Sequence, residues 1–592
     1  MSLNSDLSNL FDTFASILQI KGEPVFKAIS FQKVARLLKD TPIDIRKAVE
    51  DGSIAELEGV GPSSRRIIEE FVKTGRSTDF EEVAASVPPG LLNLLEIPGM
   101  GPKTIALLWK ERNVESMEDL VKAIDSGKLE GLKGIGEKKI ESIKAGIALR
   151  AKAGGRMAIV DALPIAEAML EQLRKIDGVE RAEIAGSLRR RKETIGDVDL
   201  ICSIKKADAG GEIAKKFTEL PEVERVLGQG ETKASVLTAG GLQIDLRLVP
   251  IVHFGAALQY FTGGKEHNVK LRSLAIDKGM TLNEWGLYRQ ADYDKAEKKT
   301  GQPPAAKAVA SRTEKEIYDA LGLEMPDPLL REDRGEIEAA AAGKIPKLIE
   351  LSDIRGDLHT HTTASDGKNS IEEMAEAAIA LGYQFLAITD HSKSQVIAGG
   401  LTAERLLAHV KEIHRVGEKL KKKITLLAGC EVDILADGRM DFEDAVLAEL
   451  DIVVGSPHIA LKQDQQKATD RLLRAIENRY VNIIGHPTGR LIDQREGLPL
   501  DFAKVFKAAA ESGTALEING SWPRFDLDDP QARAAVSAGA KLSIDTDAHS
   551  TSGLSMMPFG INVARRGWVQ RRDVINCLSI GELREFISRK RK

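Results

Sequence analysis

The chain has 592 residues, of which 42 % are hydrophobic and 29 % charged, an ordinary composition for a soluble protein of roughly three to five domains. The formal net charge of −5 excludes a uniformly basic protein, so any contact with nucleic acid must come from local patches. Three widely separated cysteines fit a reducing cytoplasm, and no apolar run is long enough to span a bilayer. We therefore expect a cytoplasmic protein with no signal peptide and no membrane partner.

Short amphipathic helices are predicted along the first 155 residues, and a Gly-apolar-Gly triplet recurs among them. The triplets follow one another after intervals of 40 and 35 residues, and their glycines are Gly59, Gly61, Gly99, Gly101, Gly134 and Gly136. Glycine lets the backbone approach a DNA phosphate, and the next helix then points its N-terminus at that phosphate. Three purely structural turns are the alternative, because many helix–helix turns contain glycine.

The next distinctive segment predicts a turn that binds phosphate. An apolar run ends at Ala185, so Gly186 and Ser187 are expected to lead from a strand into a helix. Backbone N–H groups there, with the Ser187 hydroxyl, can hold phosphate oxygens. Arg189 and Arg190 add permanent positive charge beside the turn.

Carboxylates follow on two predicted strands. Asp197 and Asp199 lie two residues apart, so both project from one face while Val198 turns to the core. Asp245 occupies the polar face of the alternating stretch 243–248. Three such carboxylates can carry two divalent ions for in-line phosphoryl transfer. A lone Asp-x-Asp would more often end a strand, but the neighbouring turn and arginines favour a metal site.

Eight of the ten histidines lie after Asp353, where apolar runs repeatedly end in histidine or a carboxylate. Helical segments separate these runs, which predicts a parallel α/β barrel with polar residues at the carboxyl ends of its strands. Imidazole and carboxylate together suit Zn²⁺, Mn²⁺ or Fe. A single histidine in such a place is more often only hydrogen-bonded, whereas six with nearby carboxylates favour a metal centre.

These motifs resemble the bacterial family X DNA polymerases, which carry a polymerase and histidinol phosphatase (PHP) domain. The resemblance implies an all-α helix-hairpin-helix region, an α/β nucleotidyltransferase palm with a thumb, and a C-terminal distorted (β/α)7 barrel. We expect a lyase-like helical domain at 1–85, helix-hairpin-helix fingers at 86–155, the palm at 156–250, the thumb at 251–325, a linker at 326–352 and the PHP nuclease domain at 353–592.

The resemblance also assigns roles to individual residues. Asp197, Asp199 and Asp245 would be catalytic, and the nucleotide would be bound by Gly186, Ser187, Arg190, Gly196, Tyr260, Phe261, Gly263 and Asn268. DNA would be bound by Lys27, Gly59, Gly61, Gly99, Gly101, Gly134, Gly136 and Arg272. The family's usual serine after Gly263 is Gly264 here. The lysine that forms a Schiff base in the lyase domain is replaced by Ile67, which cannot be a nucleophile.

In the barrel the resemblance fills nine metal-ligand positions, which implies an active site for up to three ions. They are His359, His361, Asp366, His391, Glu431, His458, His486, Asp547 and His549. We expect Mg²⁺ or Mn²⁺ at the palm and Mn²⁺, Zn²⁺ or Fe in the barrel.

The function expected from the resemblance is template-directed filling of short gaps in DNA repair by a monomer that uses gapped or primed DNA and dNTPs. The barrel would add 3′–5′ exonuclease activity and, as a further expectation, cleavage at abasic sites. The alternative is a DNA-binding scaffold whose PHP domain is a small-molecule phosphatase. Untemplated nucleotide transfer to RNA is a third class, which shares the palm but not the thumb signature.

Overall fold

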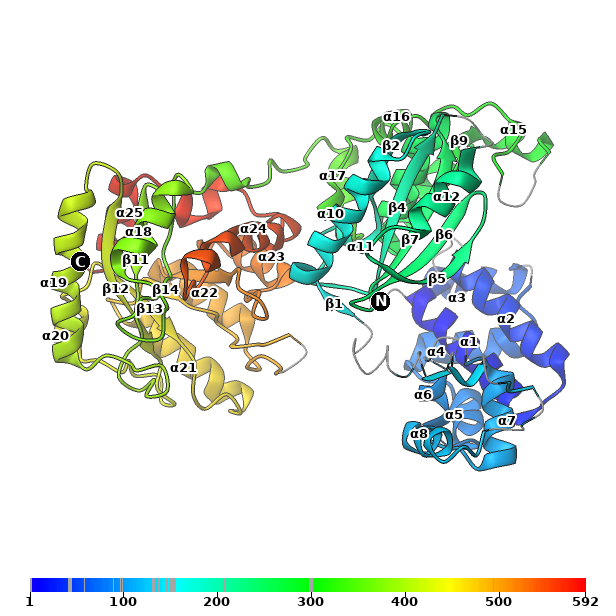
Figure 1. Ribbon diagram of the computed structural model, residues 1–592, viewed down its shortest axis with the longest axis horizontal. Coiled ribbons are helices and arrows are strands. Elements are labelled where there is room, and N and C mark those ends of the chain that lie inside the picture. The colour runs from blue at the N-terminus through cyan, green and yellow to red at the C-terminus, as the bar shows by residue number, and fades with distance from the viewer. Residues whose placement is uncertain are drawn as a thin grey trace. The chain divides into compact units, whose positions relative to one another are not determined.

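The computed structural model describes residues 3–40, 45–57, 59–88, 90–95, 97, 100–129, 132, 134–136, 139–141, 143–144, 147, 156–205, 209–297, 302–492 and 495–591 (Figure 1). It divides into two compact units, Met1–Gly343 and Lys344–Lys592. In the part of the chain so described, no helix is long and apolar enough to cross a membrane.

Short helices build the N-terminal region. They are α1 (Leu3–Lys21), α2 (Val25–Asp40), α3 (Ile45–Glu50), α4 (Pro62–Thr74), α5 (Thr78–Ala85), α6 (Gly90–Leu94), α7 (Pro102–Arg112) and α8 (Met117–Asp125). The side chains of Ser77 and Ser116 accept the N3 backbone N–H of α5 and α8, so each begins with a standard N-cap. One apolar core gathers around Phe11 and Phe14, and a second around Leu91 and Ile105.

The glycine triplets adopt one repeated turn. The residue between the glycines donates its N–H three residues back in each copy: Val60 to Leu57 at 3.1 Å, Met100 to Ile97 at 2.9 Å and Ile135 to Leu132 at 3.0 Å. Gly59 and Gly134 have φ of 96° and 97°, a conformation that favours glycine. The second glycine of each copy (Gly61, Gly101 or Gly136) accepts the N–H four residues on, and a Cβ there would meet nothing within 4 Å. Gly99 lies outside the described residues.

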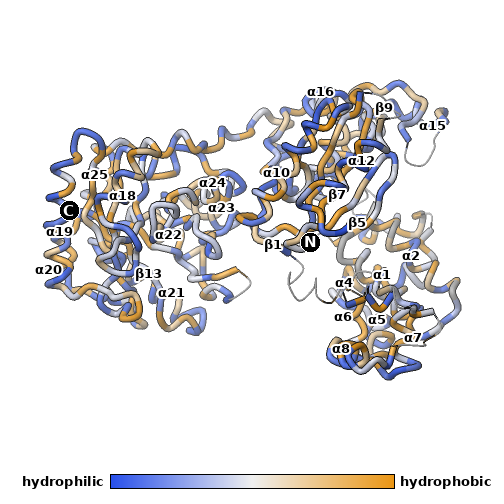
Figure 2. Tube along the Cα trace, viewed as in Figure 1, coloured by the Kyte–Doolittle hydropathy of each residue, from blue (hydrophilic) through white to orange (hydrophobic). Residues whose placement is uncertain are grey.

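The palm is a five-stranded mixed sheet in the order β2-β4-β7-β6-β5. Its strands are β2 (Val179–Ile184), β4 (Asp197–Ile204), β5 (Val223–Gln229), β6 (Lys233–Thr238) and β7 (Gln243–Pro250). The short strands β1 (Met157–Ala158) and β3 (Thr194–Ile195) pair with each other, and the helices are α10 (Ile159–Lys175), α11 (Gly186–Arg189) and α12 (Gly210–Thr218). Figure 2 shows the hydrophobic segments gathered along the central strands near β7.

The thumb combines helices with one hairpin. Its elements are α13 (Phe254–Thr262), α14 (Lys265–Asp277), β8 (Met280–Asn283), β9 (Gly286–Arg289), α15 (Gln290–Lys295), α16 (Glu314–Ala320) and α17 (Glu336–Ala341). The buried His267 ring contacts Glu336 through Nδ1 at 2.6 Å and the Tyr318 hydroxyl through Nε2 at 2.8 Å. Arg331 is fully buried against Glu314. The first part of the predicted linker, up to Gly343, therefore packs within the first unit, and the domain boundaries remain predictions.

The second unit is the predicted barrel. Seven parallel strands follow in chain order: β10 (Gly356–Asp357), β11 (Phe385–Ile388), β12 (Thr425–Asp433), β13 (Ile452–Ser456), β14 (Ile483–Ile484), β15 (Ala515–Asn519) and β16 (Leu542–Asp545). A parallel bridge between Thr360 and Ala548 links the first strand to the last and nearly closes the barrel. The sequence-based fold class is thus confirmed: a helix-hairpin-helix region, mixed sheets and a PHP-type barrel.

Helices surround these strands. They are α18 (Ile371–Ala380), α19 (Ala403–Leu420), α20 (Asp444–Leu447), α21 (Gln465–Glu477), α22 (Phe502–Ser512), α23 (Asp529–Ser537), α24 (Met557–Arg566) and α25 (Ile580–Arg591). In Figure 1, α19 runs along the outer side of β12. Strand interiors such as Phe385–Ile388 and Ile452–Ser456 are buried throughout, as expected for parallel strands covered on both faces.

Candidate functional site

Two candidate centres follow from this fold, and the first lies where β4 and β7 run side by side. The strands pair in parallel, and their register places Asp199 opposite Asp245 and Asp197 opposite Gln243. Val198 and Ile244 on the opposite face have no exposed surface. The alternation expected from the sequence is therefore present, and the carboxylates gather on the polar face of neighbouring strands.

The Gly186 turn lies directly against these carboxylates. Gly186 has φ of 63°, and a Cβ built there would lie 2.8 Å from Asp199 Oδ2. The Ala185 N–H donates to the Asp199 carbonyl at 2.8 Å. Ser187 stands in the first turn of α11, and Gly196 immediately precedes Asp197 on β4. The turn and the acidic strand thus form one local structure, as the sequence predicts.

The electrostatics of this centre are dominated by neighbouring carboxylates. Burial raises the pKa of Asp199 to about 7, with repulsion from Asp197 adding to the shift and Arg247 opposing it. Burial and Asp245 also raise the pKa of Asp197. Neighbouring carboxylates that resist ionisation are the donor set to which a divalent cation restores full charge. The residues present therefore fit such an ion.

The arginines beside the turn bind protein groups in this structure. Arg189 forms a paired contact with Glu314, at 2.9 and 2.7 Å, and donates to Thr262 Oγ1 at 2.7 Å. Arg190 donates to Glu332 at 2.8 Å and to the Thr262 carbonyl at 2.8 Å. Both therefore tie the palm to the thumb, and the binding of a triphosphate by Arg190 stays a prediction.

Other predicted nucleotide contacts cluster at the end of α13. A Cβ on Gly263 would lie 2.5 Å from Asn268 Oδ1, and Asn268 Nδ2 donates to the Tyr260 carbonyl at 2.6 Å. The Tyr260 and Phe261 rings lie edge to face, 5.1 Å apart, and Arg247 stacks on Phe261 at 4.2 Å. These residues contact one another, and Arg247 of β7 joins them to the palm sheet, while their roles remain predictions.

The predicted DNA contacts are less constrained. Arg272 on α14 has a buried Nε with no hydrogen-bond partner in the part of the chain described. Lys27 is exposed on α2 and pairs only loosely with Glu23 at 3.4 Å. Ile67 is 1 % exposed in the first helical core, so the lyase-lysine position is a packing position here.

The second centre gathers the predicted histidines and carboxylates at the carboxyl ends of the barrel strands. Three groups have potential ligand atoms within 4.8 Å of one another: His361, Asp366, His391 and His549; His359, His361, Glu431 and Asp547; and His391, Glu431 and His458. His486 joins them through Nε2, 2.9 Å from Glu431 Oε1. All nine predicted ligands therefore meet in one site, with Glu431 at its centre.

Outer residues hold several of these rings by one nitrogen. His359 Nδ1 contacts Glu517 at 2.7 Å, His458 Nδ1 contacts Asp433 at 2.5 Å, and His549 Nδ1 contacts the Asp547 carbonyl at 2.7 Å. Each contact fixes the ring orientation and leaves Nε2 directed at the cluster, as in metal sites whose ligands are supported from behind. The backbone of His486 and Asp547 has positive φ, 24° and 51°, which is the local strain common at functional sites.

Buried polar atoms without hydrogen-bond partners indicate which kind of ligand the cluster can bind. His359 Nε2, both ring nitrogens of His361, Glu431 Oε2 and Asp547 Oδ1 are buried without hydrogen-bond partners among the described residues. His361 Nε2 and Asp547 Oδ1 are 3.1 Å apart yet form no hydrogen bond with each other. Burial and His391 lower the pKa of His361 to about 4, which keeps a neutral ligand nitrogen. The donor set fits divalent metal ions.

The sequence-based prediction missed the supporting carboxylates. Glu517 and Asp433 orient His359 and His458, and the buried Asp390 holds the loop of Asp366 by accepting from Thr362 and Ser365. Asp433 lies two residues after Glu431 on β12 and so faces the same way, which the spacing could have revealed. Glu517 interrupts the apolar strand β15, a signal of a buried partner.

Comparison with known proteins identifies several of the domains. Family models match the chain as a helix-hairpin-helix domain at 2–77, a tandem of the same kind at 91–149, a DNA polymerase beta thumb at 257–332 and a PHP domain at 357–521. The matched domains define the class, a polymerase-beta-type enzyme joined to a PHP barrel.

Individual relatives identify the family within this class. The "DNA polymerase/3'-5' exonuclease PolX" of Bacillus subtilis is 38 % identical over 586 residues, 99 % of either chain. The chain therefore belongs to the PolX family. DNA polymerase lambda of Rattus norvegicus is 25 % identical over 56 % of each chain. A probable phosphatase of Thermoanaerobacter sp. is 28 % identical over 247 residues, which are 40 % of this chain and 95 % of that protein.

Proposed function

We propose that the chain is a DNA-directed DNA polymerase of family X whose barrel is a metal-dependent 3′–5′ exonuclease. The full-length likeness to a protein named for both activities supports this proposal. The observation that carries it is the presence of two separate clusters of potential metal ligands in one chain. One is the Asp199–Asp245 pair beneath the Gly186 turn, and the other is the buried cluster around Glu431.

In the palm, different residues would have different roles in nucleotide addition. Two divalent ions, Mg²⁺ or Mn²⁺, would neutralise the charge that develops on the transferred phosphoryl group. Asp197 and Asp199 would hold both ions, and Asp245 would hold one and draw the proton from the primer 3′-hydroxyl. The Ser187 hydroxyl and the N–H groups of the turn would bind the triphosphate of the incoming dNTP.

In the barrel, the proposed substrate is the 3′-end of a DNA strand. Metal ions held there, Mn²⁺, Zn²⁺ or Fe, would supply Lewis acidity at the phosphodiester. His359, His361, Glu431 and Asp547 would form one ligand group, since all four are buried and their ligand atoms lie within 4.8 Å of one another. Glu517 and Asp433 would keep the imidazoles in the orientation that ligation requires. Cleavage at abasic sites would use the same centre.

The second candidate is a DNA-binding scaffold with a PHP small-molecule phosphatase. Its support is the likeness of nearly the whole Thermoanaerobacter phosphatase to 40 % of this chain. A phosphatase function of the barrel, however, would not explain why carboxylates are aligned across β4 and β7. We accordingly place the cytoplasmic, monomeric repair polymerase first, with gapped or primed DNA and dNTPs as its partners.

Extension and degradation of a gapped duplex test the proposal. With Mg²⁺ and the dNTP complementary to the template, the labelled primer should lengthen until the gap is filled. With Mn²⁺ and no dNTP, the primer should shorten from its 3′-end. Incorporation that ignores the template base would exclude a template-directed polymerase, and hydrolysis restricted to phosphate monoesters would favour the phosphatase.

A further inference from the structure

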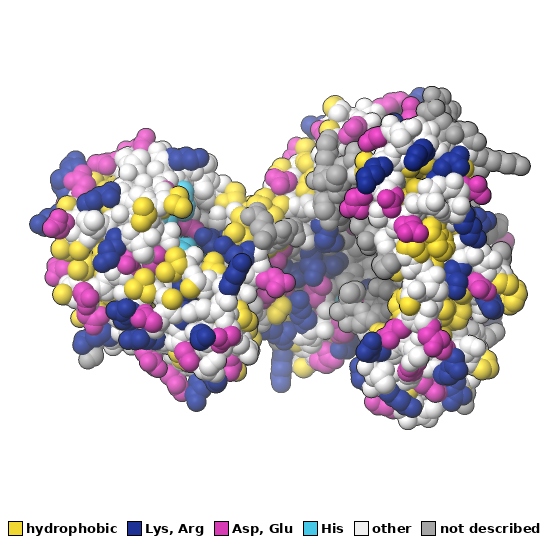
Figure 3. Space-filling model, turned by 90° about the horizontal axis from the view of Figure 1, so that it is seen from below, with side chains coloured by type: hydrophobic (Ala, Val, Ile, Leu, Met, Phe, Trp, Pro, Cys, Tyr) yellow, Lys and Arg dark blue, Asp and Glu magenta, His cyan; other side chains and the backbone are white. Residues whose placement is uncertain are grey.

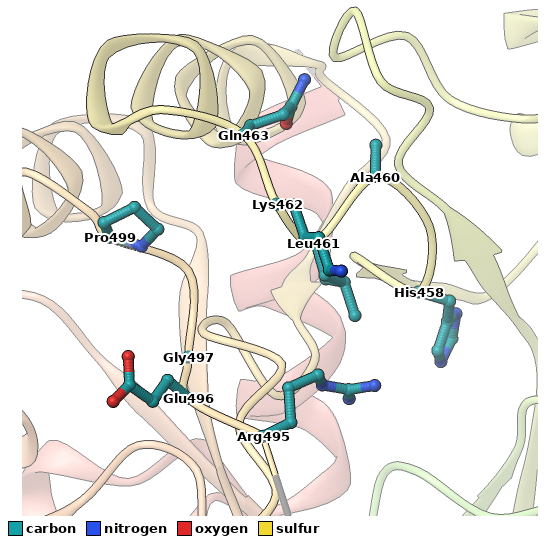
Figure 4. Close-up of a pocket in the computed structure, with 9 residues that line it drawn as sticks. All are labelled: His458, Ala460, Leu461, Lys462, Gln463, Arg495, Glu496, Gly497 and Pro499. Atoms are coloured by element: carbon teal, nitrogen blue, oxygen red, sulfur yellow. The ribbon is translucent and has the colours of Figure 1, made fainter.

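A groove of about 720 Å³ opens beside the metal-ligand cluster, at the ligand His458. Its lining includes Leu461, Lys462 and Gln463 after β13 on one wall, and Arg495 and Gly497 before α22 on the other. In Figure 4 the Arg495 and Lys462 side chains extend into the same space as His458, while Glu496 points away from them. We call this cavity the His458 groove.

Hydrogen bonds fix both walls of the His458 groove. On the first, Arg471 Nη1 donates to the Ile459 carbonyl at 2.7 Å, and Gln463 Nε2 donates to the Ala436 carbonyl at 2.8 Å. On the second, Arg495 donates through Nε and Nη2 to the Gly489 carbonyl, at 3.0 and 2.7 Å. A Cβ on Gly489 would lie 3.2 Å from Leu461, so the walls meet below the groove. The groove is preformed.

Two cationic side chains, Lys462 and Arg495, face the groove, and Glu496 is the carboxylate in its lining. In the part of the chain that the structure describes, neither Lys462 nor Arg495 pairs with a carboxylate. Burial and the nearby Arg524 lower the pKa of the Arg495 guanidinium, and Asp526 opposes that shift. Figure 3 shows histidine side chains reaching the surface of this unit with Lys and Arg side chains beside them.

The chemistry of the groove identifies a ligand. Two cations that form no ion pair with a carboxylate among the described residues, together with Leu461 in the same lining, suit a chain of phosphates whose sugars pass over an apolar surface. A nuclease that acts at a 3′-end needs to hold the strand on the 5′ side of the scissile bond. We propose that the His458 groove binds the sugar–phosphate backbone of the nucleotides just 5′ of that bond. This inference rests on the proposed exonuclease function of the barrel.

The test compares a long and a minimal substrate in the full-length protein with Mn²⁺. The probes are a single-stranded decathymidylate and the p-nitrophenyl ester of thymidine 5′-monophosphate, which has no nucleotide to fill the groove. The K462A/R495A double variant should lower kcat/KM for the decamer roughly tenfold or more. The slope of log(kcat/KM) against log[salt] should flatten by about 1.4, since each single-strand phosphate contact contributes about 0.7. Hydrolysis of the ester should be unchanged.

Matched controls separate this effect from charge alone. The variant K504A/K507A removes two exposed lysines from α22, outside the groove lining, and should leave both substrates unaffected. Arg495→Lys keeps the positive charge but loses the paired bonds to Gly489. It should therefore retain most of the decamer activity if the charge binds the strand, and lose it if the loop position alone matters. An unchanged decamer KM and salt slope in K462A/R495A would overturn the proposal, as would an equal loss in K504A/K507A.

Photocrosslinking tests the groove independently of hydrolysis. Decathymidylate with 4-thiothymidine two nucleotides from its 3′-end should crosslink within residues 457–463 or 495–499. If the wild type degrades neither substrate but gives this crosslink, the exonuclease assignment fails and the groove stands. If degradation occurs and crosslinks fall only elsewhere, the groove assignment fails and the exonuclease stands.

Discussion

At the scale of single residues, Gly186 shows how one backbone position serves the palm centre. Its positive φ of 63° and the 2.8 Å from a hypothetical Cβ to Asp199 Oδ2 leave no room for a side chain. We predict that Gly186→Ala displaces the Asp199 carboxylate and lowers nucleotide addition at least ~10²-fold, as when a charge-stabilising group is lost. Primer extension on a gapped duplex measures the loss, while 3′–5′ degradation should persist.

A matched glycine provides the control. Gly211 lies in α12, and a Cβ there would meet nothing within 4 Å, so Gly211→Ala should leave extension within about twofold of wild type. Equal activity of both variants would show that the turn does not position Asp199.

The same residues show how far sequence reasoning reaches. Asp197, Asp199 and Asp245 follow from the period of two, because alternation is a local property of a strand. The pairing of His359 with Glu517 is not local: the two residues are 158 positions apart and meet only when β10 and β15 close into one barrel. Spacing identifies the ligands and can mark Asp433 and Glu517 as notable polar positions, whereas the fold identifies which ring each of them orients.

At the scale of elements, the buried network between α11, α16 and the segment after it ties palm to thumb. Burial opposes ionisation of Glu314, but Arg331 and Arg189 outweigh it and lower the Glu314 pKa to about 2. A depressed folded-state pKa stabilises the fold above the unfolded value near 4.5, and that contribution is lost as pH falls from there towards 2.

We therefore predict that Glu314→Gln destabilises the palm and thumb at pH 7 by about 3 kcal/mol, the cost of removing one partner of a buried ion pair. The difference from wild type should shrink as the pH approaches 3. Urea unfolding followed by hydrogen exchange in α13 and α16 measures it. Asp319→Asn removes an exposed pair with Lys315 on the same helix and should cost less than about 0.5 kcal/mol. A pH-independent Glu314→Gln effect would contradict the ionic explanation.

Helix α4 carries the second prediction at this scale. Ile67 takes the position of the lyase nucleophile and packs in the helical core with 1 % exposure. Borohydride trapping on DNA with a 5′-deoxyribose phosphate should therefore give no adduct within residues 1–85. A strong adduct mapped to that range would refute this, and the same assay with a lyase-proficient family X polymerase is the positive control.

Elements that depend on local sequence patterns were predicted better than those that depend on contacts between distant residues. The three glycine turns repeat a local pattern, and their common hydrogen bonds follow from it. The packing of residues 326–343 onto the thumb depends on His267 meeting Glu336 and Arg331 meeting Glu314. The charged and proline-containing sequence of residues 326–343 is typical of an exposed linker. Only the contacts with His267 and Glu314 reveal that the segment is packed.

At the scale of the whole molecule, the chain offers two centres with different donor chemistry. The palm presents carboxylates, which suit Mg²⁺, while the barrel presents imidazoles that discriminate against Mg²⁺ in favour of Mn²⁺, Zn²⁺ or Fe. The ligands of the two centres belong to different compact units. Each activity should therefore have its own metal preference and its own set of inactivating substitutions.

The most direct test crosses one substitution from each centre on a single labelled gapped duplex, with metal content measured in every purified protein. Asp245→Ala should lose extension with Mg²⁺ by at least ~10³-fold and keep degradation with Mn²⁺. His359→Ala and Asp547→Ala should lose degradation and bound metal while gap filling persists. If the barrel variants keep both degradation and metal, or if either folded variant loses both activities together, the account of two independent centres is contradicted.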